Sequence, residues 1–140
     1  SDIECYYSTF GMTVEMTLLL GRDQWYAEGQ PVMRHHRDFE DKSGLDKSFC
    51  VFVAPLVHRD TLNTFWGSNK AGYEGRRQAI IPLNLEQFIA VLRGARKKIA
   101  TGSLTHNNLM SLLESLTQGV ETHNNPHDWI ATFPQFIESW

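Results

Sequence analysis

Two stretches near the start of the chain are rich in strand-forming residues, and the second alternates along its length between two faces. They cover residues 3–7 and 13–20, and the residues between them include Gly11, which suits a hairpin turn. We therefore expect an antiparallel pair of strands. A continuous apolar run of strand length, "SFCVFVAP" at 48–55, predicts a further strand that is buried on both faces.

The remaining segments alternate between helical patterns and turn-rich stretches. One helix is expected to begin near Asp23 and to end at Gly29 and Pro31, because glycine and proline commonly end helices. Asn84 is a suitable N-cap for a helix that follows a strand ending at Pro82. Helices are expected within 58–66, 85–99, 104–120 and 126–140, the last interrupted by Pro134, and loops at 39–47 and 67–77. This order predicts an α/β fold in which helices flank a mixed β-sheet and C-terminal helices follow.

Composition restricts the class of protein. The 140-residue chain is 41% hydrophobic and 21% charged, which is typical of one globular domain. No apolar run approaches the roughly 18–20 residues of a membrane helix, so we expect a cytoplasmic protein with no membrane partner. The 2 cysteines lack the spacing of a zinc site. The net charge of −3 hides a basic segment at 76–98, which suits either a modest polyanion-binding surface or a solvated helix end.

Acidic residues interrupt the N-terminal hairpin where they could share one site. Alternation places Glu15 on the same face of its strand as Thr17, and an antiparallel partner would bring Asp2 close to Glu15. Like charges on neighbouring strands repel unless a cation lies between them, and Mg²⁺ prefers carboxylate oxygens. Gln24 and Glu28, four residues apart on the next helix, share one face. The spacing allows a metal site for phosphodiester hydrolysis, and edge-strand acids that prevent aggregation are the alternative interpretation.

Three segments carry a resemblance to a known family: "DIECYY", "VEMTLLLGRDQW" and "AEGQPVMRH". They resemble the catalytic segment of the AlwI-like type IIS restriction endonucleases and related nicking enzymes, within the PD-(D/E)XK nuclease superfamily. The likeness covers roughly residues 2–92 and implies a restriction-endonuclease-like core. The matching positions are Asp2, Glu15, Thr17, Gly21, Gln24, Trp25, Glu28, Gly29, Pro31, Val32, Arg34 and His35.

The resemblance implies a role for each matching polar residue of the site. Asp2 and Glu15 are expected to bind Mg²⁺, with Mn²⁺ as a substitute, and Glu28 is expected to complete the acidic set. Thr17 stands where the superfamily usually has a lysine that orients or polarises the attacking water. Gln24 is expected to position water or phosphate, with helix capping or packing as the alternative.

Cationic residues are expected to supply what Thr17 lacks and to bind DNA. The missing positive charge would come from the metal, or from Arg34 or Arg22. The residues expected to contact DNA are Arg22, Arg34, His35, Arg76 and Arg77.

These expectations describe residues 1–140 as one nuclease domain, a fragment without its N-terminal helix and without a DNA-recognition domain. The expected function is Mg²⁺-dependent hydrolysis of double-stranded DNA by a type IIS-like restriction or nicking enzyme of a restriction-modification system. A second cleavage subunit or a homodimer would be needed to cut both strands. The alternatives are a repair or junction-resolving nuclease of the same fold, and a catalytically inactive DNA-binding or assembly module.

Overall fold

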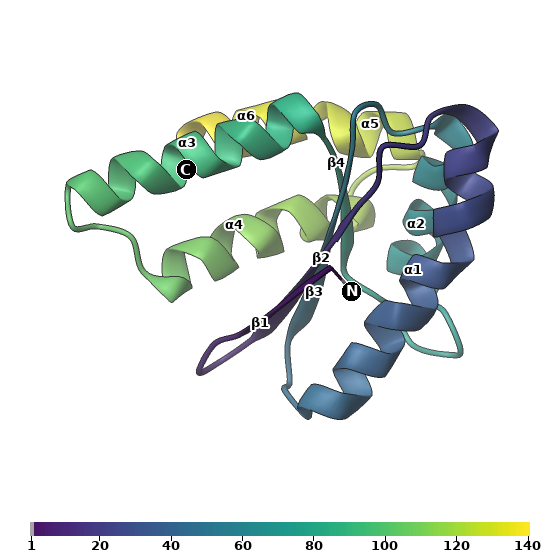
Figure 1. The fold of residues 1–140 in the computed structure, drawn as a ribbon, viewed down its shortest axis with the longest axis horizontal. Coiled ribbons are helices and arrows are strands. Elements are labelled where there is room, and N and C mark those ends of the chain that lie inside the picture. Colours follow the sequence, from purple (N-terminus) through teal and green to yellow (C-terminus); the bar gives the residue numbers. More distant parts are fainter. Residues whose placement is uncertain (1) are drawn as a thin grey trace.

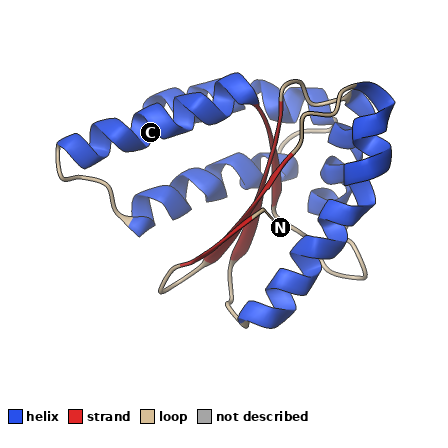
Figure 2. Ribbon diagram, viewed as in Figure 1, coloured by secondary structure: helices blue, strands red, loops and turns tan. Residues whose placement is uncertain are grey.

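A computed structural model describes residues 2–140, and its centre is a four-stranded mixed sheet (Figures 1 and 2). The strands are β1 (Ile3–Tyr6), β2 (Gly11–Met16), β3 (Ser48–Ala54) and β4 (Ile80–Asn84), and they lie side by side in that order. The β1–β2 pair is antiparallel, whereas β2–β3 and β3–β4 are parallel. This arrangement confirms the predicted α/β fold with a mixed sheet.

Helices cover both faces of the sheet. They are α1 (Gly21–Ser43), α2 (Arg59–Lys70), α3 (Leu85–Ala100), α4 (His106–Gln118), α5 (Pro126–Ala131) and α6 (Phe133–Ser139), with a short 3₁₀ turn at Gly119–Glu121. In Figure 1, α1 and α2 lie on one side of the sheet, and α3 and α4 lie on the other. None of the helices within residues 2–140 has the length and apolar character that crossing a bilayer requires.

Strand alternation divides the core into two parts. Cys50 and Phe52 of β3 pack with residues of α1 and α2. Val51 and Val53, which point the opposite way, pack with residues of α4, α5 and α6. Because β3 is buried on both faces, its sequence is almost uniformly apolar, as the pattern predicted.

Helix α1 differs from its prediction. It runs without interruption through Gly29 and Pro31, where the sequence predicted its end, and stops at Gly44 in the left-handed conformation at φ 65°. Tertiary packing outweighs the local preference of these residues, because one side of α1 is buried along most of its length. At Gly29 a Cβ would lie 3.1 Å from the Trp25 ring of the same helix, so a larger residue would crowd this ring, and 3.8 Å from Thr64 of α2, which is an ordinary contact. The predicted loop at 39–47 is therefore wrong over its first half, which is helical.

Smaller boundary errors have equally local causes. The second strand ends at Met16 rather than at residue 20, and Gly11 lies in β2, where its missing Cβ makes room for the Phe39 ring. Strand β4 continues past Pro82, which is tolerated because β4 is an edge strand. Helix α2 extends to Lys70, four residues beyond its predicted end. The predicted capping by Asn84 is confirmed as a full capping box.

Candidate active site

The register of the N-terminal hairpin brings Asp2 beside Glu15. Ile3 is paired with Val14, and the Asp2 backbone N–H donates to the Val14 carbonyl at 3.2 Å. Antiparallel pairing then sets Asp2 opposite Glu15, on the face that α1 covers. The Asp2 Oδ2 atom accepts a hydrogen bond of 2.6 Å from the Met16 N–H, which orients this carboxylate along the end of β2.

Helix α1 adds two further groups to this face. The Glu15 carboxylate is buried, and its Oε1 atom lies 3.2 Å from Nδ1 of His35. Burial raises the pKa of Glu28, and the negative charges of Glu15 and, to a smaller extent, Asp2 raise it further. A hydrogen bond from Thr17 and the nearby His35 lower the same pKa. Asp2, Glu15, Thr17, Glu28 and His35 therefore form one electrostatically coupled cluster.

The chemistry of this cluster fits a divalent cation. Within residues 2–140 there is no group of three or more His, Cys, Asp and Glu side chains already arranged to hold a metal ion. Burial is the largest cause of the raised pKa of Glu28, and the negative charges of Glu15 and Asp2 add repulsion to it. A hard cation bound by carboxylate oxygens relieves this repulsion. Asp2, Glu15 and Glu28 are the residues that could hold it.

Thr17 organises the loop that joins β2 to α1. Its backbone N–H donates to the Val53 carbonyl at 3.0 Å, so it continues the pairing of β2 with β3. Its hydroxyl accepts a hydrogen bond of 3.1 Å from the Leu19 N–H and also interacts with Glu28. Thr17 thus fixes a loop and a carboxylate, and it carries no charge that could replace a lysine.

Gln24 is fully buried, and its amide bonds to the backbone of two loops. The Nε2 atom donates to the carbonyls of Leu19 at 3.0 Å and Leu56 at 2.7 Å, and Oε1 accepts from the His58 N–H at 2.8 Å. These contacts join the β2–α1 loop to the β3–α2 loop. They favour the packing role over direct contact with water or phosphate.

Two of the predicted DNA-binding arginines lie on α1, the helix that also carries Glu28. Arg22, in the first turn, is highly exposed, and its Nε lies 3.9 Å from Asp60. Arg34 is also exposed and precedes His35. Among the residues predicted to contact DNA, His35 lies in the acidic cluster, because its ring contacts Glu15.

The other two predicted arginines lie elsewhere. Arg76 is paired with Asp41 at 2.9 Å, and Arg77 with Glu121. Asp41 is thirteen residues beyond Glu28 on α1, so it lies about 20 Å further along the helix. The structure therefore does not bring Arg76 and Arg77 together with the acids.

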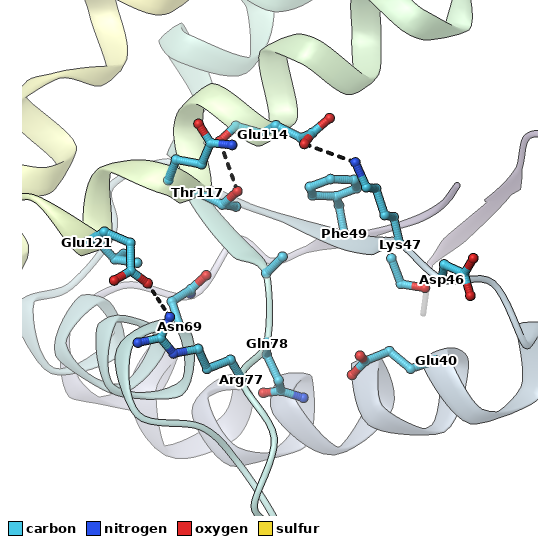
Figure 3. A pocket seen from close by; sticks show the side chains of 14 residues that line it. Glu40, Asp46, Lys47, Phe49, Asn69, Arg77, Gln78, Glu114, Thr117 and Glu121 are labelled. Atoms are coloured by element: carbon cyan, nitrogen blue, oxygen red, sulfur yellow. Dashed lines mark hydrogen bonds and ion pairs between the residues drawn. The ribbon is translucent and has the colours of Figure 1, made fainter. Parts of the chain in front are cut away.

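Arg77 instead lines a polar pocket of about 360 Å³ at the other end of the parallel strands, where β3 begins (Figure 3). The pocket lies near Ser48, where β3 begins, whereas the acids lie near the carboxyl end of β2. Lys47 and Arg77, the cations that line it, are paired with Glu114 and Glu121. This pairing leaves the pocket without an evident role in the chemistry of the acidic cluster.

The proximity of His35 to Glu15 was not predicted. Glu28 and His35 are seven residues apart, which is two turns of helix and therefore one face. This signal was present in the sequence, but it becomes readable only when α1 is taken as continuous through Gly29 and Pro31.

Comparison with known proteins agrees with this arrangement. The sequence model of the AlwI restriction endonuclease family matches residues 1–91, which include every member of the cluster. The chain belongs to the AlwI restriction endonuclease family. A search of curated proteins finds no match.

The fold of this AlwI-family chain is similar to the crystal structure of the small subunit (R.BspD6I2) of the heterodimeric restriction endonuclease R.BspD6I. The TM-score is 0.71 at 20% sequence identity, and the similarity covers 92% of this chain. The chain spans 64% of that subunit. At this level of identity the likeness supports the fold and confirms the predicted restriction-endonuclease-like core.

Proposed function

We propose that the chain is the cleavage domain of a type IIS-like restriction or nicking enzyme that hydrolyses phosphodiester bonds of double-stranded DNA with Mg²⁺. One observation carries the proposal: the carboxylates of Asp2 directly before β1, Glu15 of β2 and Glu28 of α1 influence one another and lie near His35 on one face of the sheet. Membership of a restriction endonuclease family supports the substrate and the reaction.

The acidic residues would hold the metal. Asp2, Glu15 and Glu28 offer oxygen ligands of the kind that Mg²⁺ and its substitute Mn²⁺ accept. When bound, such a cation lowers the pKa of water and offsets the charge that develops on the phosphodiester. Thr17 holds Glu28 by a hydrogen bond, and the backbone N–H of Met16 holds Asp2, so two of these carboxylates are oriented in advance.

His35 is proposed to fill the place of the superfamily lysine. Its ring is oriented by Glu15 at 3.2 Å, and the side chain is 43% exposed, so it can reach a substrate. In its protonated form an imidazole supplies a positive charge, and in either form it can exchange a proton. Arg34 and Arg22 are then left to contact the DNA backbone, which arginine suits.

A partner chain completes the proposal. One such site cuts one strand, so cleavage of both strands needs a second subunit or a second copy. The relative of known structure is the small subunit of a heterodimeric enzyme, which supports a division of cleavage between two chains. Sequence recognition is proposed to lie outside residues 1–140, and a cytoplasmic location stays a prediction.

Nicking of supercoiled plasmid in Mg²⁺ or Mn²⁺ tests the proposal. The unmodified chain is expected to produce nicked circles, and Glu15→Gln is expected to abolish them. Glu138→Gln is the matched control, because this exposed acid on α6 lies outside the cluster. Equal nicking by the Glu15 variant would refute the proposed site.

Binding of Mn²⁺ gives a measurement that does not depend on turnover. Paramagnetic broadening of NMR signals is expected at Asp2, Glu15 and Glu28 and is expected to be lost in Glu28→Gln. Broadening centred on other acids would place the metal elsewhere and would refute the ligand set.

A further inference from the structure

Helix α3 exposes an unusual amount of apolar surface. Although it is 16 residues long, none of its residues is buried. Leu85, Ile89, Leu92 and Ile99 follow one another at intervals of four, three and seven, so they form a single stripe. Their exposed fractions are 42%, 37%, 52% and 65%.

The stripe is continuous with an apolar groove of about 320 Å³. This groove lies between α3, α4 and the β1–β2 hairpin, and α3 and α4 extend beyond the sheet there (Figure 1). Its lining includes Ile3, Phe88, Leu92, Leu104 and Leu109. Leu92 belongs to both the stripe and the groove, and we call the two together the α3 docking surface.

The apolar arc of α3 is wider than its contacts within the chain require. At about 100° per residue, the positions from Val91 to Ile89 cover about 160° of the helix, against roughly 100° for a helix packed on one side. On its other side α3 contacts the Trp140 ring at Gly94, where a Cβ would lie 3.1 Å away. The chain therefore supplies partners for the Gly94 side of α3 and for Phe88 and Val91, which pack against the core, whereas Leu85, Ile89 and Ile99 stay exposed within residues 2–140.

The charge beside the stripe identifies the partner. Arg93, Arg96 and Lys97 are exposed, and none of them forms an ion pair with a residue that the structure describes. Arg96 lies within the stripe, four residues after Leu92. The apolar side chains of leucine and isoleucine can pack against the apolar side of a partner helix, but they form no favourable contact with DNA phosphates. Cations next to the stripe favour carboxylates on that helix.

We propose that the α3 docking surface binds an amphipathic helix of a partner chain, with apolar residues every three or four positions and acidic residues beside them. The helix would place its apolar side in the groove and along the stripe, and its carboxylates against Arg93 and Arg96. This surface is built by α3, α4 and the hairpin face opposite Glu15, so the inference does not depend on the proposed nuclease activity.

Titration of the 140-residue chain with a designed peptide tests the inference. The peptide has about three heptads with leucine at a and d and glutamate at e and g, which also prevents it from pairing with itself. Its twin carries lysine in place of every glutamate. The glutamate peptide is expected to bind and to shift NMR signals of the groove, and the lysine twin to bind at least ~10-fold more weakly.

Variants of the chain separate the two parts of the surface. Leu92→Glu is expected to abolish binding, and Arg96→Glu to weaken it by ~10-fold or more. Both side chains are exposed, so both variants are expected to fold. Leu56→Glu, at a leucine that is 68% exposed in the β3–α2 loop, is the matched control and is expected to bind normally.

Three outcomes would overturn the inference. The first is equal binding of both peptides, and the second is no saturable binding of either. The third is self-association of the chain in sedimentation experiments that Leu92→Glu abolishes, because the occupant would then be a second copy.

Discussion

Replacement of Gln24 by leucine tests how the two loops beside the candidate site are held together. Gln24 is fully buried and bonds to the carbonyls of Leu19 and Leu56 and to the N–H of His58. Leucine has a similar size and keeps the apolar contacts of α1. Gln24→Leu therefore removes the hydrogen bonds with little change in volume.

The expected loss is about 3 kcal/mol in the free energy of unfolding. Each of the three part-buried hydrogen bonds contributes about 1 kcal/mol net. For a chain of this size, this loss corresponds to a decrease in Tm of about 10 °C. Because Leu19 is two residues from Thr17, binding of Mn²⁺ by the neighbouring carboxylates is expected to weaken as well.

Urea unfolding followed by circular dichroism measures the first effect, and NMR broadening by Mn²⁺ measures the second. Gln30→Leu is the matched control, since Gln30 is an exposed residue of the same helix. Equal stability of the Gln24 and Gln30 variants would refute the view that this amide fixes the loops. A destabilised Gln24 variant with unchanged Mn²⁺ binding would show that the loops do not orient the carboxylates.

Three other side chains lead to measurable predictions. Glu15→Gln is expected to lower the pKa of Glu28 towards its ordinary value, because a neighbouring negative charge is removed; an unchanged carboxyl titration by NMR would contradict this. Gly11→Ala is expected to lower the free energy of unfolding by about 1–3 kcal/mol, because its Cβ would lie 2.8 Å from the Phe39 ring, and urea unfolding that matches the unmodified chain would refute the clash. Burial lowers the pKa of His36 from 6.5 to about 4. The contribution of neutral His36 to the free energy of unfolding is therefore expected to be fully present above pH 6.5 and to fall as the pH decreases towards 4. An identical decrease in His36→Leu would assign the effect to other groups.

The sequence was enough to predict which segments form strands, although not all of their bounds, because each strand obeys a local rule. Alternation placed Glu15 and Thr17 on one face, and the uniform apolar run at 48–55 marked a strand covered on both sides. Asn84 identified the start of α3 because a capping box is a local motif. These features depend on residues that are close in the chain, so no knowledge of packing was needed.

The course of α1 could not be predicted in the same way, because it is decided by distant residues. Gly29 and Pro31 are each unfavourable inside an isolated helix. In the folded chain, Gly29 and Val32 are both buried, and Val32 packs with Phe52 and Phe65 one position after the proline. The free energy of this packing comes from residues about 20 to 50 positions away, such as Phe52, Phe65 and Ile80, which a local pattern does not contain.

The error over α1 also determined what could be said about the site. If α1 ended at Gly29, Glu28 would stand in its last turn, and His35 would lie beyond it with no fixed relation to Glu15. Because α1 continues, Glu28 and His35 lie on one face two turns apart, and the imidazole reaches Glu15 at 3.2 Å. The chain has Thr17, just after β2, where the superfamily usually has a lysine, and the His35 imidazole approaches Glu15 from the helix instead. Whether another group replaces the lysine therefore depends on α1 as well as on Thr17. A variant that removes the imidazole of His35 and places a lysine at position 17 tests this. Thr17→Lys combined with His35→Ala is expected to keep metal-dependent nicking that His35→Ala alone loses, and equal inactivity of the single and double variants would show that the imidazole does more than supply a charge.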